Sequence, residues 1–404
     1  MCGYSRVLRV PELRQSLLHS MAKKKKAPLV GPAALPFEAP IDDVRSRLAE
    51  LEELAQKTTH DLSEELSFYT ERLQRLTDEI YSDLTAWNRV QVARHPNRPL
   101  TSDYIEHLCE DWVELHGDGV FGDDRAMVTG LATIHGHKVM VVGHRKGRDT
   151  KDRLACNFGS AHPEGYRKAL RKMKLAERMG LPIVCLVNTP GAYPGVAAEE
   201  RGQARAIAEN IFEMFAMKVP IIVMVIGEGG SGGALGIGIG DRVGMMENSW
   251  YSVITPEGCA SILWRSAEGK EKAADALKLT GSSLLKLGIV DKVVPEPTGG
   301  AHNHSLEAVQ LVGKQIDAWL TELGKLSPEE LMRQRDLKFR NIAKLESELV
   351  AAAHSHESKV SVPSETELPQ AENVQNPQSP DPTAVDPPRR GGLKAPQNPS
   401  EELK

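Results

Sequence analysis

The sequence predicts an α/β domain with helical segments on both sides. Between about residues 98 and 300, short apolar runs typical of strands alternate with stretches of helical periodicity, which is the order of elements in α/β domains. Over 41–87 and 305–353 the apolar residues recur only at helical spacing. A chain of 404 residues is long enough to bury a large core around such a sheet.

The composition excludes several classes of protein. Hydrophobic residues make up 40% of the chain and charged residues 26%, as in ordinary soluble proteins. The net charge of -5 argues against a nucleic-acid surface, and no apolar run approaches the roughly 20 residues that span a membrane. The five cysteines form no C-x-x-C pair, so we expect no metal site here and reduced thiols in the cytoplasm.

The N-terminal part is expected to contain a disordered leader followed by a helical hairpin. Residues 1–40 lack periodicity and contain no apolar block of a secretory signal. A first helix begins at Ile41, and Asp61-Leu62-Ser63-Glu64 has the spacing of a capping box for a second. Apolar residues of the second helix, from Leu62 to Trp87, are three or four positions apart, which is typical of helix-on-helix packing. We therefore expect a hairpin over 41–90 that packs on the main domain or on a partner chain.

The central domain is expected over 91–303. Its strands are predicted from short β-branched runs without charges, at Lys138–His144, Ile183–Asn188, Ile221–Ile226, Tyr251–Ile254 and Ile289–Val294. One helix runs from Pro163 to Met179, with proline at its first position. Another runs from about Ala198 to Met217.

The C-terminal part is expected to form helices and then a disordered tail. Within 304–353, one helix covers Ser305–Leu323, and Ser327 caps a second helix that ends near Ala353. Residues 354–404 are rich in proline, serine and charge but have almost no large apolar residues. Such a segment buries too little surface to offset the entropy of ordering.

The most informative segment is Gly227–Ala234, which directly follows the apolar run Val219–Ile226. A strand that ends at a glycine turn and opens a helix presents bare backbone N–H groups to a ligand. The segment matches the dinucleotide fingerprint, but the next predicted strand ends in Ser252–Thr255 and lacks the acidic residue that this fingerprint requires.

Two further hypotheses remain for the same segment. Gly229-x-Ser231-x-Gly233 matches the nucleophile elbow of serine hydrolases, although no histidine, His144 included, stands in a recognisable triad context. Alternatively, the amides of Gly232 and Gly233 form an oxyanion hole without a side-chain nucleophile. The simplest alternative is that the small residues only let the helix pack closely on the sheet.

An ordered series of motifs resembles the carboxyltransferase alpha-subunit family of multisubunit acetyl-CoA carboxylase. The resemblance covers about 41–350 and rests on Gly143–Thr150, Asn157–Gly159, His162–Leu170, Thr189–Gly195, Ala198–Gln203, Gly227–Ala234, Tyr251–Trp264 and Pro295–His302. It implies a crotonase-like (ClpP/crotonase) fold of repeated ββα units. Some positions depart from the family pattern: Gly119, Ser160, Ala161, Asn188 and Ala197.

The resemblance also implies a reaction and partners. The family transfers a carboxyl group from carboxybiotin, carried on the biotin carboxyl carrier protein, to acetyl-CoA, and so forms malonyl-CoA for fatty acid biosynthesis. The carboxyltransferase beta subunit would hold zinc and acetyl-CoA, and the two would assemble as an α2β2 heterotetramer beside biotin carboxylase. No cofactor is expected to be covalently bound to this chain. The alternative is a non-catalytic scaffold subunit of the same complex.

The resemblance implies site residues as well. By motif position, the amides of Gly232 and Gly233 would stabilise negative charge on the ureido oxygen of biotin, which itself takes the methyl proton, so that no side-chain base is required. Substrate-binding positions would be Gly229, Gly230, Gly191, Ala192 and Tyr193. The cations Arg145, Lys146 and Arg148 would contact an anionic group of CoA or carboxybiotin; an ion-paired loop at a subunit interface is the alternative for them.

Overall fold

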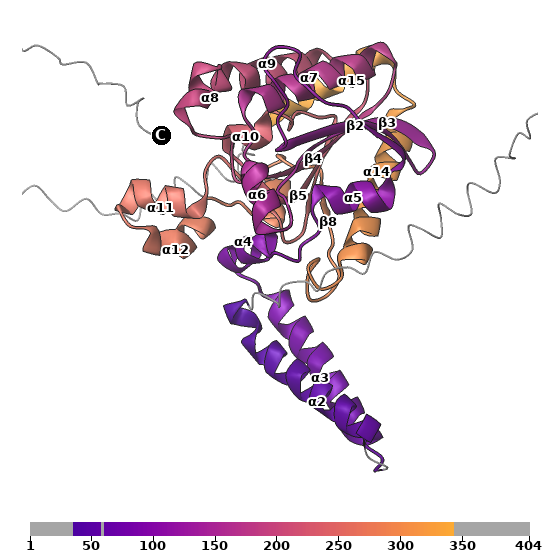
Figure 1. Ribbon diagram of the computed structural model, residues 1–404, viewed down its shortest axis with the longest axis vertical. Coiled ribbons are helices and arrows are strands. Elements are labelled where there is room, and N and C mark those ends of the chain that lie inside the picture. The colour runs from indigo at the N-terminus through magenta and orange to yellow at the C-terminus, as the bar shows by residue number, and fades with distance from the viewer. Residues whose placement is uncertain (1–34, 58–59, 343–404) are drawn as a thin grey trace, which may run out of the picture. The chain divides into compact units, whose positions relative to one another are not determined.

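Figure 1 shows the computed structural model, which describes residues 35–57 and 60–342. The first 34 residues of the expected leader and the whole expected tail lie outside these ranges. So does 343–353, the last part of the expected C-terminal helix. Within the described ranges, no helix is long and apolar enough to cross a membrane.

A mixed eight-stranded sheet forms the centre of the described chain (Figure 1). Its order is β1-β2-β3-β4-β5-β6-β8, and β7 pairs with β5. β1, β2 and β3 are antiparallel, and every later pairing is parallel. The strands β1 to β8 are, in order, Glu110–Glu114, Met127–Ile134, His137–His144, Ile183–Thr189, Ile221–Gly230, Arg242–Met246, Trp250–Ser252 and Lys292–Val294.

The sheet confirms the predicted fold class, an α/β crotonase-like fold containing ββα units. Two consecutive strands followed by a helix occur twice. β2 and β3 precede α7 (Pro163–Arg178), with the short helix α6 (Thr150–Ala155) in between, and β6 and β7 precede α11 (Pro256–Trp264). The long strand β5 has two partners on one edge: Ile222–Val225 pairs with β6, and Glu228–Gly230 pairs with β7. The second partner extends the sheet at the glycine-rich end of β5.

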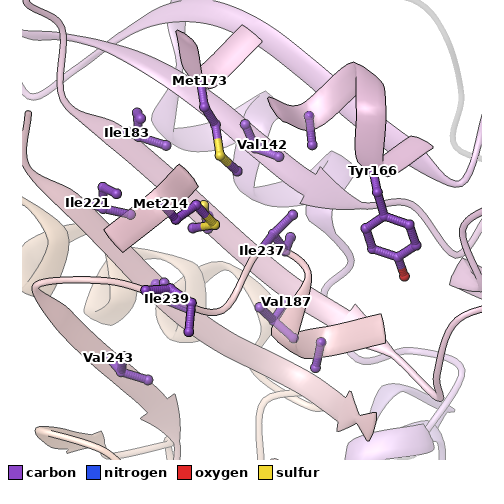
Figure 2. Close-up of a cluster of buried hydrophobic side chains, with 14 of the residues drawn as sticks. Val142, Tyr166, Met173, Ile183, Val187, Met214, Ile221, Ile237, Ile239 and Val243 are labelled. Carbon is purple, nitrogen blue, oxygen red and sulfur yellow. The ribbon is translucent and has the colours of Figure 1, made fainter. Parts of the chain in front are cut away.

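Helices cover both faces of the sheet because its parallel strands are apolar on both faces. On one face, Met173 of α7 and Met214 of α9 pack on Ile183 and Ile221 (Figure 2). On the other, α14 packs on the intervening strand residues. The remaining helices are α2 Ala39–Lys57, α3 Ser63–Ser82, α4 Ala86–Arg94, α5 Thr101–Leu108, α6 Thr150–Ala155, α8 Val196–Glu200, α9 Gln203–Ala216, α10 Ser231–Leu235, α12 Lys270–Ala276, α13 Gly281–Lys286, α14 Ser305–Leu323 and α15 Pro328–Asn341, with 3-10 turns η1 Pro36–Glu38, η2 Asn157–Gly159 and η3 Ala267–Gly269.

Three strands were not predicted from the sequence. β1 is an exposed edge strand with three acidic residues, and β2 and β6 each contain a glycine. The glycine in β2 is required by packing, since a Cβ at Gly130 would lie 2.4 Å from the Trp112 ring. Charge and glycine are both depleted in strands, so these segments did not show a strand pattern.

Three predicted helices have different limits. The helix expected over Ala198–Met217 is two helices, α8 and α9, because Gly202 between them adopts a left-handed φ of 81°. The second hairpin helix, α3, ends at Ser82, so Trp87 belongs to the separate helix α4. α2 starts at Ala39, two residues before the predicted start.

The hairpin of α2 and α3 is joined to the sheet domain by a buried polar contact. Glu38 accepts hydrogen bonds from the Tyr81 hydroxyl (2.5 Å) and contacts His302 Nε2 at 3.3 Å. Glu38 and His302 are both buried. α3 contains no buried residue. At the base of the hairpin, an apolar cluster lies beside this polar contact: Leu35, Leu84 and Val92 are buried, and Ile80 packs against them.

Candidate active site

The glycine segment is not the turn that the sequence predicts. β5 continues as a strand through Gly227, Glu228, Gly229 and Gly230, and the last three residues pair with β7. The strand ends at Gly230, and α10 begins at the next residue, Ser231, whose φ of 54° is left-handed. The glycines therefore lie on a buried strand end, where hydrogen bonds to β7 fix their positions.

The loop after β4 lies directly against this strand end. Thr189, the last residue of β4, pairs with Gly229. A Cβ added at Gly230 would lie 2.1 Å from the Pro190 carbonyl oxygen, and one at Gly233 would lie 2.4 Å from the Ala192 nitrogen. The structure thus brings the predicted loop residues and the predicted glycines together, and close packing requires glycine at 230 and 233.

Gly232 differs from these two glycines. A Cβ at this position would lie 3.7 Å from Ile207 Cδ1, which is an ordinary contact. Its φ is outside the left-handed region that favours glycine. Neither packing nor backbone conformation therefore explains glycine at 232. The N–H groups of Gly232 and Gly233 belong to the first turn of α10, where amides have no acceptor within the helix.

Of the other predicted loop residues, Gly191 borders the segment and Tyr193 turns away from it. Gly191 has a φ of 152°. A Cβ added at Gly191 would lie 4.0 Å from the Cβ of Ser231. The Tyr193 ring stacks on His162, with centroids 4.2 Å apart. Tyr193 therefore helps to shape the loop through its backbone and ring.

Lys146 is the predicted cation that reaches the segment. It forms an ion pair with Glu228, which is buried and also accepts from Arg94 Nε at 2.6 Å. Arg94 in turn binds Glu257 at 2.5 Å. Burial acts to raise the pKa of Glu228, but the charges of Lys146 and Arg94 outweigh it and hold this pKa below its usual value. The carboxyl group is therefore ionised at neutral pH.

The three predicted cations point to three different places. Arg145 is 41% exposed and lies 4.0 Å from Glu114, on the β1 side of the sheet. Arg148 pairs with Asp103 of α5. The structure therefore does not bring Arg145 and Arg148 to the glycine segment.

His144 is buried at the end of β3 and serves as a hydrogen-bond acceptor. Its Nδ1 accepts from the Asn188 backbone N–H at 3.4 Å. Burial lowers the pKa of His144 to about 3, so the imidazole is neutral at physiological pH. Among the described residues, no histidine forms a hydrogen bond with Ser231, and a serine-hydrolase triad is therefore not assembled.

Arg94 and Glu257 are site residues that sequence analysis missed. Their signal was Glu228 itself, the only charge in an apolar and glycine-rich stretch. A carboxylate in such surroundings must be paired with a cation. Arg94 comes from α4, and its second partner Glu257 comes from α11. Nothing in the sequence shows that α4 meets β5 or that Arg94 meets Glu257. In the described part of the chain, no group of three metal-ligating side chains occurs.

Two cavities border the segment. A polar cavity of about 170 Å³ is lined by Arg94, Lys146, Pro190 and Glu228, among others. An apolar cavity of about 470 Å³ contacts Ser231 and Leu235 and is lined mainly by side chains of α9, α13, α15 and β7. The glycine segment therefore separates a charged site from an apolar one.

Comparison with known proteins gives consistent matches. The family described as acetyl co-enzyme A carboxylase carboxyltransferase-like matches residues 34–343. The chain is 50% identical over 313 residues to the acetyl-coenzyme A carboxylase carboxyl transferase subunit alpha of Bacillus cereus, covering 78% of this chain and 97% of that protein. The Listeria monocytogenes subunit of the same name is 52% identical over 306 residues, covering 76% and 96%.

Among solved structures, the chain is similar to one chain of a Pseudomonas malonate decarboxylase hetero-tetramer in complex with coenzyme A. The TM-score is 0.45 at 17% sequence identity. The match covers 59% of this chain and 93% of that one.

Proposed function

The chain belongs to the acetyl co-enzyme A carboxylase carboxyltransferase-like family, and from this premise we infer that it is the alpha subunit of the carboxyltransferase. It is an enzyme subunit that transfers a carboxyl group from carboxybiotin to acetyl-CoA to form malonyl-CoA. The match covers 97% of the Bacillus cereus subunit and 96% of the Listeria monocytogenes subunit.

The backbone amides of Gly232 and Gly233 are proposed as the catalytic groups. When the carboxyl group leaves, negative charge develops on the ureido oxygen of biotin, and two adjacent N–H groups can stabilise it. The observation that supports this role is Gly232, where glycine is required by neither packing nor φ. A side chain there would narrow the approach to the amides. One such donor is typically worth roughly 2.7–4 kcal/mol.

The residues around the amides are proposed to hold the substrate. Gly229 packs against β7 and Gly230 against Pro190. Gly191 and Ala192 border the segment from the loop after β4, which Tyr193 helps to shape. Lys146 supplies a positive charge at the polar cavity. Arg145 and Arg148 remain predicted contacts for an anionic group, and their ion pairs with Glu114 and Asp103 favour the alternative of a structural loop.

The proposed partners are the carboxyltransferase beta subunit, in an α2β2 heterotetramer, the biotin carboxyl carrier protein and biotin carboxylase, in the cytoplasm. Acetyl-CoA and the zinc ion are assigned to the beta subunit. Large apolar side chains are exposed on elements that line the apolar cavity and support a subunit contact there, notably Val253 (76% exposed) and Phe212 of α9 (76%). Exposed apolar surface of this kind is typical of protein interfaces.

The test is coexpression with a beta subunit and measurement of malonyl-CoA-dependent carboxylation of biocytin. We expect Gly232→Ala to fold and assemble normally, because its Cβ has room, but to lower kcat by roughly tenfold or more. Gly122→Ala is the matched control, since an added Cβ there contacts nothing. An unchanged rate in Gly232→Ala would contradict the oxyanion role. A wild-type complex that assembles without activity would favour the scaffold alternative.

A further inference from the structure

The polar cavity beside the glycine segment is unusually rich in cations. Its lining includes Arg94, Arg98, Lys146 and Arg153, against the single carboxylate Glu228. These residues come from α4, from the chain between α4 and α5, from the chain after β3, and from α6. The tertiary structure has therefore gathered positive charges from distant parts of the sequence.

The carboxylates around the cavity do not balance these charges. Glu296 binds Arg98 at 2.5 and 3.0 Å. Glu228 is shared by Arg94 and Lys146, and Glu257 binds Arg94. These three carboxylates thus face four cations. Arg153 forms no ion pair with any described residue, and one positive charge is left over.

The rim of the cavity is held in a strained backbone conformation. Asn157 and Phe158 have φ angles of 46° and 55°, in the left-handed region that costs energy for residues other than glycine. This conformation places Phe158 at the cavity with half of its surface exposed. Such strain concentrates at sites that bind ligands, and here it supplies an aromatic wall beside the cations.

We propose that this cavity binds the carboxylate group of a monoanionic ligand, and that Arg153 is the residue that pairs with it. A guanidinium matches a carboxylate through two parallel hydrogen bonds. One unbalanced positive charge suits a monoanion better than a doubly charged phosphate. A cavity of about 170 Å³ is smaller than whole-ligand sites of roughly 300–1,000 Å³, so it holds an anionic group rather than a complete cofactor.

The cavity adjoins the strand end that leads into the proposed catalytic amides, since Glu228 lines it and Gly230 precedes Gly232 by two residues. Pro190 lines it, and the carbonyl oxygen of Pro190 lies against Gly230. Two sources of a carboxylate monoanion fit this place: free bicarbonate, and the N-carboxylate of carboxybiotin. The assignment of the ligand as carboxybiotin rests on the proposed function. The inference that the cavity binds a carboxylate does not depend on that function.

The binding test uses the full-length chain with formate as the probe. Arg153→Gln removes the charge at a half-buried position, and Lys151→Gln is the control, because Lys151 is an exposed cation of the same helix that does not line the cavity. We expect formate, compared with chloride at equal ionic strength, to raise the thermal midpoint of wild type and Lys151→Gln but not of Arg153→Gln. Arg153→Lys, which keeps the charge, should retain part of the effect. An equal formate effect in Arg153→Gln would overturn the proposal.

The second measurement identifies the source of the carboxylate. In the complex with the beta subunit, we expect Arg153→Gln to raise KM for the carboxylated carrier protein roughly tenfold, with a smaller change in kcat, through loss of a charged hydrogen bond. A formate effect together with an unchanged KM assigns the cavity to free bicarbonate. A wild-type complex that makes no malonyl-CoA contradicts the proposed function, and the formate result stands independently of it.

Discussion

The two cavities beside the glycine segment are built by different means. The polar cavity is defined by charges: Glu228 is held by Lys146 and Arg94, and the surrounding backbone is strained at Phe158. The apolar cavity is defined by side-chain packing around Ser231 and Leu235, with an edge-to-face contact of Phe215 and Phe339 at 5.0 Å. One strand end thus presents a charged surface on one side and an apolar surface on the other.

The difference between the two cavities depends on the glycine segment that separates them. The largest loss of activity is therefore expected from Gly233→Ala, which changes the contact of this segment with the loop after β4. Its Cβ would lie 2.4 Å from the Ala192 nitrogen, which is backbone that cannot easily move. We expect a loss of activity of about 100-fold or more and a lower thermal midpoint from overpacking. The measurements are malonyl-CoA formation and thermal unfolding of the same samples. Full activity at an unchanged midpoint would show that the loop and the segment are not in contact.

The polar side is tested next by Glu228→Gln. The substitution leaves Lys146 and Arg94 without their shared buried counter-charge. Breaking a buried pair costs roughly 3–5 kcal/mol, and we expect the lower end, since the two cations are 17% and 30% exposed. Chemical denaturation measures the change. Lys146→Gln is the control. It should lower the free energy of unfolding clearly less than Glu228→Gln, because Arg94 still pairs with Glu228. An equal loss in both variants would mean that the pair of Arg94 with Glu228 contributes nothing to stability.

The smallest effect expected is a pH dependence from His144, which accepts a hydrogen bond from Asn188 at the lining of the polar cavity. The pKa of His144 is lowered to about 3 by burial, so below its usual value near 6.5 the unfolded chain binds a proton that the folded chain does not. Stability therefore falls as pH falls from about 6.5 toward 3, by about 2 kcal/mol between pH 7 and pH 5.

Denaturation curves at pH 7 and pH 5 check this for wild type and His144→Asn. The variant should lose less stability than wild type on acidification. Phe215→Ala, on the apolar side, should be destabilised equally at both pH values. A wild-type stability that is the same at pH 7 and pH 5 would mean that His144 is accessible to protons in the folded state.

Most of the framework was predictable from the sequence. The strands β3, β4, β5, β7 and β8 and the helices α7 and α14 follow from apolar periodicity and helix signals. Local patterns are sufficient for the strands and α14 because these elements bury mainly apolar residues, and α7 is marked by the proline at its first position although it also buries Lys168 and Lys172. Edge strands and glycine-containing strands do not show such a pattern, which is why β1, β2 and β6 were missed.

The candidate site was predictable only in part. The sequence marked the glycine segment, the loop at Gly191 and Lys146, because their residue types are unusual where they occur. It did not show that β5 continues through the glycines or that Arg145 and Arg148 point elsewhere. Those outcomes depend on the pairing of β5 with β7 and on the direction of each side chain.

By itself, the sequence determined the α/β class, the family and the position of the glycines, since these depend on local periodicity and on ordered motifs. The tertiary structure alone decided that Arg94, Arg98, Lys146 and Arg153 share one cavity, and that glycine is required by packing at 230 and 233 but not at 232. Close approach and charge balance depend on which atoms meet across the fold, and that information is absent from the spacing of residues along the chain.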